Sequence, residues 1–392
     1  MYSKTQFAHL LEGLPRGVFD KLVRKNHADK YSKGFRCWDQ FVALSYAQFT
    51  RCRSLRELES SFNAQAAHHY HLGTRPIKRS TLADANAKRD SRIYEAACQH
   101  LLQGVHRGLR RELGNMLYLM DSSPIVLEGN GFDDWAGAYR NHRKQGLKLH
   151  MMIEAHNESI PCYTKITGMQ VSDIRIGQRI PLTSEATYVF DRGYYSYNWW
   201  YRIDQLQSTF VTRLKSNANI TVQCQHLVAA SAQNILADET IQLNNRYVKA
   251  QTEKNLYHNK PLRRITVKND SRLPPLVIVT NDFDRSASEV AALYKKRWEI
   301  ELFFKWIKQN LRLKHFLGRS ENAVKIQIYI SLISYLLLYL YRKKHGITMS
   351  MKLLLSTLKV SLFQRKRTED TLARRRSRWR AEIASLQGSF AF

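Results

Sequence analysis

The spacing of apolar residues changes twice along this chain, and that change constrains the fold more than any other feature. Residues 1 to about 115 show the three- and four-residue spacing of helices. From residue 116 to about 280 the apolar runs are short, β-rich and bounded by Gly, Asn and Pro, as strands are. Helical spacing returns at Ser286. The sequence therefore predicts an α/β protein in which helices precede and follow a strand-rich middle.

Two of the predicted strands end in an acid. Strands are predicted at 115–127, 147–157, 159–168, 185–195 and 208–217, with a helix around 172–180 and further short strands within 218–280. Asp121 follows "LYLM" and Asp191 follows "TYVF", so each carboxylate is expected at the rim of a sheet, where α/β sites are commonly built. Turn chemistry is the alternative, since Asp121 begins the sequence Asp-Ser-Ser-Pro. The two interpretations stay open on these residues alone.

A basic stretch at 294–310, "YKKRWEIELFFKWIKQN", contains two glutamates. At about 100° per residue, a helix places Glu301 on one face with Tyr294, Arg297 and Lys308, and Glu299 on the opposite side. Glu299 is expected to pair with a neighbouring lysine, Lys295 or Lys296. The face with Glu301 suits a phosphodiester site, in which the acid holds a divalent cation and the bases hold a nucleic-acid backbone. An Arg297–Glu301 pair that only stabilises the helix is the alternative.

The charge of the chain indicates a polyanionic partner. The formal net charge is +29 and the pI is about 10.0, and nucleic acid is the polyanion that such a field most often serves. A membrane surface is the competing polyanion, but the sequence shows no basic amphipathic or lipidation signal. The basic run at 364–380 is expected either to touch DNA or to be a solvated end.

The N-terminal region contains a second basic cluster. Ser80 is expected to cap a helix that presents Lys88, Arg89 and Arg92 among small residues, as a helix-turn-helix-like DNA-binding unit does. A solvated helix face explains the same pattern. Lys148, with His150 beside it in "LKLH", lies near the expected active edge and is a further DNA-contact candidate, although a solvated strand residue fits equally.

Cysteine usage and apolar runs indicate an intracellular protein without membrane spans. The five cysteines form no CxxC pair, which argues against a zinc site or a disulfide framework and fits a reducing cytoplasm. The N-terminus lacks the apolar core of a secretory signal. The run at 328–341 is shorter than the ~20 residues of a membrane span and contains Ser and Tyr, so a buried core helix is expected there.

Several of these motifs together resemble one family. Tyr294, Arg297, Glu301 and Lys308 fill the Y-(2)-R-(3)-E-(6)-K signature of the insertion sequence 4 family of bacterial DDE transposases. "LYLMDSS" and "VFDRGYYS" look like the family's first and second aspartate motifs, and "NDFDRSASEVAALYKKRW" is similar to the segment before its third acid. "GFRCWDQFVAL", "SLREL" and "RSTLADANAKR" look like the helical domain that often precedes the catalytic one. The resemblance covers most of the chain.

The resemblance implies an α/β fold with a ribonuclease H-like catalytic core and a strand-rich insertion, preceded by an all-helical N-terminal DNA-binding domain and followed by C-terminal helices. The implied segments are 1–115 for the helical domain, 116–217 for the first part of the core, 218–284 for the insertion, 285–345 for the completing helices and 346–392 for a helical, basic tail.

The resemblance also implies a chemistry. Asp121, Asp191 and Glu301 would hold two Mg²⁺ ions, with Mn²⁺ as a substitute, and would carry cut-and-paste transposition through strand nicking, hairpin formation and strand transfer. Tyr294, Arg297 and Lys308 would grip the DNA. The implied partners are the terminal inverted repeats of the element, target DNA and a second copy in a synaptic dimer, in the cytoplasm at the bacterial nucleoid.

One family feature is missing, and other functions remain open. The family stacks a tryptophan of the insertion on a flipped base, but this chain has no Trp between 201 and 297; Tyr247, Tyr257 and Phe283 are the substitutes considered. The alternatives are an inactive or co-opted DNA-binding relative, a ribonuclease H-like nuclease with another task, and a basic RNA-binding protein. The last leaves the acids unexplained, and loss of Asp121, Asp191 or Glu301 would favour the first.

Overall fold

Two compact units make up the chain. The computed structural model describes residues 4–365, except 114, 130, 133, 137, 140–141, 157, 230–231, 249–252, 270–272, 312 and 314. We call Tyr94–Ser331 the sheet unit, and Met1–Ile93 with Leu332–Phe392 the helical unit. The predicted basic run at 364–380 lies outside the described residues from 366 on. The domain boundaries drawn from the sequence stay predictions.

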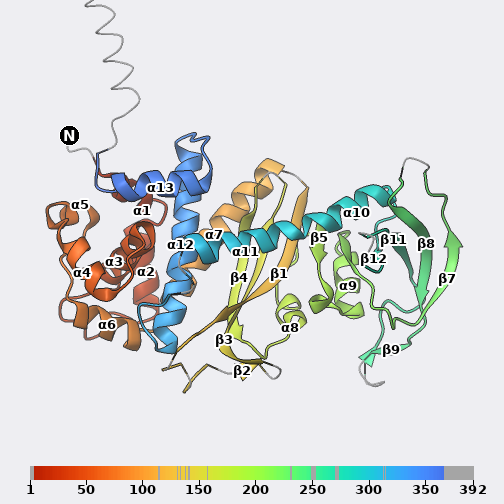
Figure 1. Cartoon of the computed structure of the whole chain (residues 1–392), viewed down its shortest axis with the longest axis horizontal. Coiled ribbons are helices and arrows are strands. Elements are labelled where there is room, and N and C mark those ends of the chain that lie inside the picture. Colours follow the sequence, from red (N-terminus) through yellow and green to blue (C-terminus); the bar gives the residue numbers. More distant parts are fainter. Residues whose placement is uncertain are drawn as a thin grey trace, which may run out of the picture. The chain divides into compact units, whose positions relative to one another are not determined.

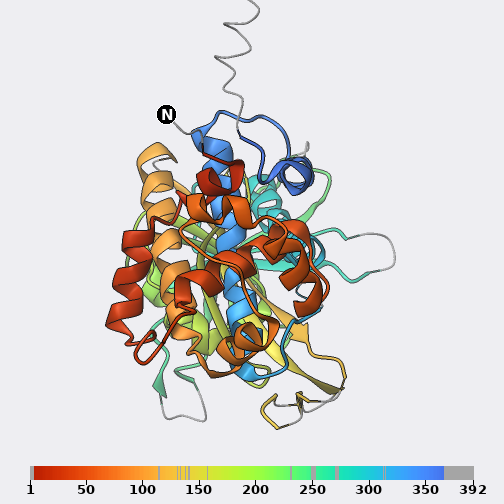
Figure 2. The ribbon, with the colours of Figure 1, turned by 90° about the vertical axis from the view of Figure 1, so that its left-hand side faces the viewer.

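The helical unit is built from short helices and the end of one long helix. Its elements are α1 (Gln6–Leu11), α2 (Arg16–Lys25), α3 (Cys37–Thr50), α4 (Leu55–Asn63), η1 (Ala66–His68), α5 (His69–Leu72), α6 (Arg79–Lys88), the second part of α12 (Glu321–Lys344) and α13 (Met351–Ser361). Every residue of α3 from Cys37 to Phe49 is buried, so this helix forms the centre of the core. Figure 2 shows the short helices of this unit around the blue α12.

Two helix starts in this unit differ in their capping. Ser54 caps α4, since its Oγ accepts a hydrogen bond from the N–H of Glu57 at 3.1 Å. The expectation that Ser80 caps the next helix is wrong. That helix, α6, begins at Arg79 with Lys78 as a cap without a side-chain hydrogen bond. It also ends at Lys88, before Arg89 and Arg92, because Arg89 has extended backbone angles.

The sheet unit contains one large mixed sheet. Its first strands are β1 (Met116–Val126), β2 (Ala138–Tyr139), β3 (His142–Glu154), β4 (Ile160–Gly168), β5 (Ala186–Phe190) and β6 (Thr209–Arg213). All of them except β2 correspond to the five strands predicted up to residue 217. The strand order is β2-β3-β1-β5-β6-β12-β11-β8-β7, with β4 pairing on β3 (Figure 1). Helix α7 (Arg92–Leu113) precedes β1, α8 (Asp173–Gly177) lies between β4 and β5, and η2 (Arg192–Tyr194) and α9 (Tyr197–Asp204) lie between β5 and β6.

The pairing of β1 places the two aspartates next to each other. β1 runs parallel to β5, with Met120 opposite Phe190. Asp121, which continues β1 past the last pair with β5, therefore lies beside Asp191, which follows the end of β5. β3 flanks β1 on the other side in antiparallel register, with His150 opposite Ser122. Parallel strands buried on both faces read as continuous apolar runs, and all five residues of β5 are buried.

The region from 218 to 280 is strand-rich, as predicted. It contains β7 (Ile220–Gln225), β8 (Ile235–Leu243), β9 (Tyr247–Val248), β10 (Glu253–Lys254), β11 (Pro261–Val267) and β12 (Leu276–Thr280). β12 pairs with β6, so β12, β11, β8 and β7 extend the main sheet (Figure 1). β9 and β10 form a separate two-stranded sheet. A buried ion pair joins β8 to β11, with Arg263 Nε 2.8 Å from Asp238 Oδ1.

The helix predicted through 294–310 is interrupted. α10 (Ala287–Lys296) ends one residue before Arg297, and α11 (Trp298–Asn310) begins one residue after it. At the junction, Arg297 N–H bonds to Tyr294 O at 3.1 Å and Ile300 N–H to Arg297 O at 3.3 Å. These bonds span three residues, the tighter winding of a 3₁₀ turn, so positions before and after Arg297 do not follow one 100° register.

The long apolar helix α12 is buried, as the sequence predicts for 328–341. It is the one helix among the described residues that is long and apolar enough to cross a membrane, and 89% of its most apolar window is buried inside the protein. Core helices of this kind are apolar all round because neighbouring elements cover them on every side.

Candidate active site

The two aspartates at the edge of the sheet are held by local backbone hydrogen bonds. Asp121 Oδ1 accepts from the N–H of Ser122 at 2.7 Å, and Asp191 Oδ1 accepts from the N–H of Gly193 at 2.8 Å. Asp191 caps η2 in this way. The Asp121 side chain is 15% exposed and Asp191 is half-buried, so solvent reaches both carboxylates only in part.

Burial raises the pKa of both carboxylates. Burial raises the pKa of Asp121 to about 7, with a further contribution from the charge of Asp191. Burial also raises the pKa of Asp191, against the lowering effects of its hydrogen bond from Gly193 and of the Arg297 charge. Such paired acids are characteristic of sites that accept a cation or a proton, because two buried negative charges repel each other.

Arg297 lies between the acids of the sheet and the acid of the helix. Its Nη1 atom is 2.7 Å from Glu301 Oε1 and 3.6 Å from Asp121 Oδ2. The guanidinium also lies over the ring of Tyr294, 5.9 Å from its centroid. The buried Nε atom has no hydrogen-bond partner within the described part of the chain. This cation therefore has one buried donor without a partner inside the site.

Tyr294 and Lys308, the other residues of the predicted helix face, contact Arg297 and β1 respectively. Tyr294 is 7% exposed and lies behind Arg297, and burial raises its pKa. Lys308 Nζ donates to Ser123 Oγ and to Pro124 O, both at 2.7 Å, which fastens α11 to β1 just beyond Asp121. The prediction that Glu299 pairs with Lys295 or Lys296 is wrong, because Glu299 forms no ion pair with any described residue.

A fourth acid, Asp173, lies beside the two aspartates and was missed in the sequence. It begins α8, and its Oδ1 accepts from Ser122 Oγ at 2.7 Å and from Lys148 Nζ at 3.2 Å. Lys148 also donates to Val171 O at 2.9 Å, so it points inward and its side chain is only 14% exposed. His150 is fully buried, with Nε2 2.8 Å from Thr167 Oγ1. The position of Asp173 after Ser172 looked like an ordinary acid at a helix start, which is why sequence reasoning passed over it.

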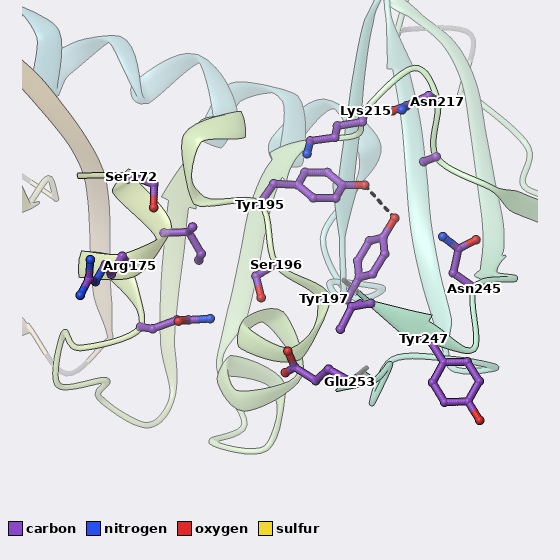
Figure 3. Close-up of a pocket in the computed structure, with 14 residues that line it drawn as sticks. Ser172, Arg175, Tyr195, Ser196, Tyr197, Lys215, Asn217, Asn245, Tyr247 and Glu253 are labelled. Carbon is purple, nitrogen blue, oxygen red and sulfur yellow. Dashed lines mark hydrogen bonds between the residues drawn. The ribbon is translucent and has the colours of Figure 1, made fainter. Parts of the chain in front are cut away.

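A hollow of about 690 Å³ opens next to η2 (Figure 3). Tyr195, Tyr197 and Tyr247 line it together with the bases Arg175 and Lys215. The Lys215 ammonium lies over the Tyr195 ring at 4.3 Å, and the hydroxyls of Tyr195 and Tyr197 are 3.2 Å apart. Among the three substitutes considered for stacking on a base, Tyr247 lines this hollow and is 52% exposed, Phe283 is 44% exposed, and Tyr257 is buried at 1%. Tyr257 therefore has no face open for a base.

Comparison with known proteins identifies the family. The family model for a transposase DDE domain matches residues 113–337, more than half of the chain. The chain belongs to this transposase family. A second model, for a domain of unknown function (DUF4372), matches residues 2–75. The chain is 36% identical over 288 residues to a putative transposase (y4zB) of Sinorhizobium fredii, covering 73% of this chain and 77% of the relative.

Two further relatives carry insertion-sequence names. A probable transposase for insertion sequence element IS5377 of Geobacillus stearothermophilus is 25% identical over 326 residues, covering 79% of this chain and 83% of that protein. A putative transposase for insertion sequence element IS4SA of Synechocystis is 46% identical over 70 residues, covering 17% of this chain and 21% of the relative. The protein is thus a DDE-domain transposase of an insertion sequence, a class of enzyme that binds and recombines DNA.

The acids of the transposase fit a divalent cation in part. Carboxylate oxygens are the ligands that Mg²⁺ and Mn²⁺ prefer, and Asp121 and Asp191 lie together with too little positive charge to offset them. Glu301, however, is ion-paired with Arg297. No group of three or more His, Cys, Asp or Glu side chains within the described ranges is gathered closely enough to hold a metal. Completing a three-carboxylate site requires Arg297 to release Glu301.

The basic residues of the N-terminal helices are not equivalent. Lys88 is exposed at the end of α6, with 78% of its side chain accessible and Asp84 3.8 Å away. Arg89 points inward, donates to Gln40 Oε1 at 3.0 Å and to Phe35 O, and is 11% exposed. Of these two predicted DNA contacts, the structure leaves only the Lys88 side chain accessible in this form of the transposase.

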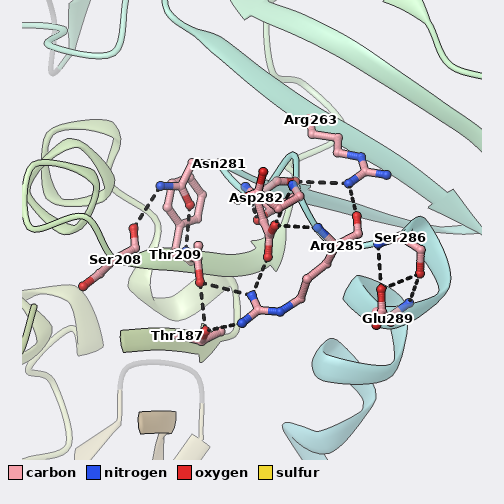
Figure 4. A network of polar contacts seen from close by, with 12 residues as sticks. Thr187, Ser208, Thr209, Arg263, Asn281, Asp282, Arg285, Ser286 and Glu289 are labelled. Carbon is pink, nitrogen blue, oxygen red and sulfur yellow. Dashed lines mark hydrogen bonds and ion pairs between the residues drawn. The ribbon is translucent and has the colours of Figure 1, made fainter. Parts of the chain in front are cut away.

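A polar network fixes the start of α10, the helix that leads to Arg297 (Figure 4). Ser286 and Glu289 form a capping box, with Ser286 Oγ accepting from the Glu289 N–H at 3.3 Å. The buried Asp282, four residues before this cap, accepts from the Asp284 and Arg285 N–H groups, both at 3.1 Å, and pairs with the Arg285 guanidinium. It orders the turn before α10.

The same network ties α10 to the sheet. Arg285 Nη2 donates to Thr187 Oγ1 of β5 at 3.2 Å, and Asn281 Oδ1 accepts from the Phe210 N–H of β6 at 2.8 Å (Figure 4). The end of β12, the start of α10 and strands β5 and β6 are thereby connected. The network holds the helical side of the transposase site in a fixed position relative to the strand that carries Asp191.

Proposed function

We propose that this transposase moves its insertion sequence by a cut-and-paste reaction, with Asp121, Asp191 and Glu301 as its catalytic acids. The observation that carries the proposal is the pair of mutually repelling carboxylates where β5 ends beside the parallel strand β1, opposite Glu301 on α11. The Y-R-E-K signature of the insertion sequence 4 family supports the same assignment.

The catalytic part is proposed to be a ribonuclease H-like core. The strand path β4-β3-β1-β5-β6 supports this, because β4, β3 and β1 pair antiparallel whereas β1, β5 and β6 pair parallel. Residues 218–284 are proposed as the insertion, and the helices before residue 115 as a DNA-binding domain that reads the terminal inverted repeats. Lys88 on α6 is the exposed base that best suits a phosphate contact there.

Each charged residue of the site is given a role. The three acids are proposed to bind two Mg²⁺ ions, with Mn²⁺ as a substitute, which supply Lewis acidity at the phosphate when bound. Arg297 uses its unpaired Nε to hold a DNA phosphate, and releases Glu301 as it does so. Tyr294 supports the guanidinium from behind, and Lys308 holds α11 against β1 beside the phosphate path.

The reaction itself proceeds by in-line displacement at phosphorus. A water oxygen attacks a phosphate at the element's end, and the 3′ oxygen leaves and takes a proton to become a 3′-OH. This hydroxyl then attacks the opposite strand, which closes a hairpin and releases the flanking DNA. After hydrolysis of the hairpin, the 3′-OH attacks target DNA and completes strand transfer. The two element ends are proposed to meet in a synaptic dimer of the transposase at the nucleoid.

A DNA-binding relative without catalysis is the second candidate. The Arg297–Glu301 ion pair favours it, because this contact keeps the third acid away from the other two. Such a protein would bind the element's ends through its positive charge and leave the strands intact.

Cleavage of a labelled duplex that bears the element's own terminal repeat tests the two candidates. The wild type and Glu301→Gln are compared with Mg²⁺ or Mn²⁺. Metal-dependent nicking and hairpin formation by the wild type alone establish the transposition chemistry and the role of Glu301. Salt-sensitive binding without cleavage by either protein establishes the DNA-binding candidate instead.

A further inference from the structure

Asp173 makes more contacts with the active edge than a helix-start acid requires. One of its carboxylate oxygens, Oδ1, is 2.7 Å from Ser122 Oγ, 3.2 Å from Lys148 Nζ and 3.4 Å from His150 Nδ1. Ser122 follows Asp121 directly in β1, while Lys148 and His150 come from β3. A single oxygen therefore contacts both strands beside Asp121, the first proposed catalytic acid.

The second oxygen of Asp173 faces the other catalytic aspartate. A Cβ atom built on Gly193 would be 2.7 Å from Asp173 Oδ2 and 2.9 Å from Asp191 Oδ1. The two carboxylates thus approach the same point over Gly193, and a side chain there would displace one of them. Glycine at this position lets the turn after β5 pass close to α8. Asp173 accordingly touches the surroundings of both Asp121 and Asp191.

We propose that Asp173 is a positioning residue of the active edge, which fixes Ser122 and Lys148 and adds negative charge beside Asp191 where a divalent cation is to bind. The inference rests on the proposed function, because it gives the cation a task at this edge. Lys148 is its counter-charge: the side chain is 14% exposed, its ammonium contacts Asp173 and Val171 O, and it limits the negative charge beside Asp191.

The electrostatic part of this role predicts opposite effects for the two partners. Removing the charge of Asp173 takes one negative charge from the neighbourhood of Asp191, and removing the charge of Lys148 leaves Asp173 uncompensated. At an effective dielectric constant near 20, charges several ångströms apart still interact strongly enough to change cation affinity by about tenfold. A contact that serves only folding would instead weaken cation binding in both variants.

The experiment measures Mn²⁺ binding to the full chain by the loss of the free-ion electron paramagnetic resonance signal, without DNA. Asp173→Asn is expected to weaken Mn²⁺ binding about tenfold, Lys148→Gln to tighten it several-fold, and the double variant to return near the wild type. Asp284→Asn, which removes an exposed acid from the loop before α10, is the matched control and is expected to bind as the wild type does. A thermal melt of each variant reports folding.

The outcomes separate this inference from the proposed function. A wild type that binds Mn²⁺ together with an Asp173→Asn variant that binds it equally well overturns the inference and leaves the function standing. Weaker binding by both Asp173→Asn and Lys148→Gln also overturns it, since that is the pattern of a folding contact. If Asp173→Asn does not fold, Lys148→Gln decides by the sign of its effect. A wild type that binds no Mn²⁺ in the absence of DNA overturns the inference alone; the proposed function is decided by the cleavage assay, because DNA is what is proposed to release Glu301 from Arg297.

Discussion

Arg297 Nη1 is 2.7 Å from Glu301 Oε1 and 3.6 Å from Asp121 Oδ2, so one guanidinium contacts an acid of the helix and an acid of the sheet. It takes a position among the acids that a cation would otherwise fill. The same residue breaks α10 from α11 through three-residue hydrogen bonds. From its position, its unpaired Nε and this local turn, we expect Arg297 to be the residue that couples DNA binding to the gathering of the acids.

Replacement of Arg297 is expected to lower the stability of the fold and to raise its affinity for a divalent cation. Arg297→Gln leaves Asp121 and Glu301 without their shared counter-charge, and should lower stability by about 2 kcal/mol in the absence of divalent ions. Mn²⁺ should then raise the melting temperature more in the variant than in the wild type, because it replaces the missing charge. Thermal melts with and without Mn²⁺ measure both effects.

Lys295→Gln is the control for this prediction, since it removes an exposed positive charge from the neighbouring turn of α10. It should leave the Mn²⁺-induced shift unchanged. Equal shifts in the wild type and Arg297→Gln would show that Arg297 does not occupy the place of a cation.

Lys308 is expected to stabilise the contact between α11 and β1 through its hydrogen bonds. Lys308→Met leaves Ser123 Oγ and Pro124 O without their donor and should cost about 1–2 kcal/mol of folding free energy. It should also reduce DNA cleavage, because α11 carries Glu301. Lys305→Met removes a similar charge from an exposed position on the same helix and should change stability by less than about 0.5 kcal/mol. Denaturant titrations separate the two; equal losses would place Lys308 among ordinary surface lysines.

Lys88 and Arg89 are adjacent in sequence and should differ in what they affect. Lys88→Ala removes an exposed charge, so DNA affinity should fall and the slope of log K against log salt should decrease by about one, with stability unchanged. Arg89→Ala leaves Gln40 Oε1 and Phe35 O unpaired in the interior and should cost about 2 kcal/mol of stability. Fluorescence anisotropy at several salt concentrations and thermal melts measure the pair. The reverse assignment would contradict the inward position of Arg89.

The strands and the paired aspartates were accessible from the sequence because both follow from local pattern. Alternating and continuous apolar runs mark strands, and an acid directly after such a run is delivered to the sheet edge. The adjacency of Asp121 and Asp191 then follows from parallel pairing of β1 and β5. The catalytic role of these acids stays a prediction, as do the DNA contacts.

The features missed in the sequence depend on partners far along the chain. Arg89 turns inward because its acceptors come from Phe35 and Gln40, and Asp173 gains its position from β1 and β3. The break at Arg297 coincides with its contacts to Glu301 and Asp121, which a helical wheel of 294–310 does not contain. Tertiary contacts of this kind override local propensity.

His150 is expected to make folding depend on pH. It is fully buried, and that burial, together with the neighbouring Lys148 charge, lowers its pKa to about 4 although Asp173 acts in the opposite direction. The unfolded chain therefore binds a proton at this residue between pH 6.5 and 4 that the folded chain does not. Its contribution to stability is present above pH 6.5 and is lost as pH falls through this window, by on the order of 2 kcal/mol.

Urea unfolding followed by tryptophan fluorescence at pH 7.5, 6.0, 5.0 and about 4 measures this effect, since Trp199 and Trp200 are buried in the sheet unit. His150→Gln keeps a donor for Thr167 but does not titrate, so the wild type should lose more stability than this variant on acidification. The exposed His226→Gln serves as the control and should follow the wild type. Parallel pH curves for the wild type and His150→Gln would mean that His150 takes up its proton without opening the fold.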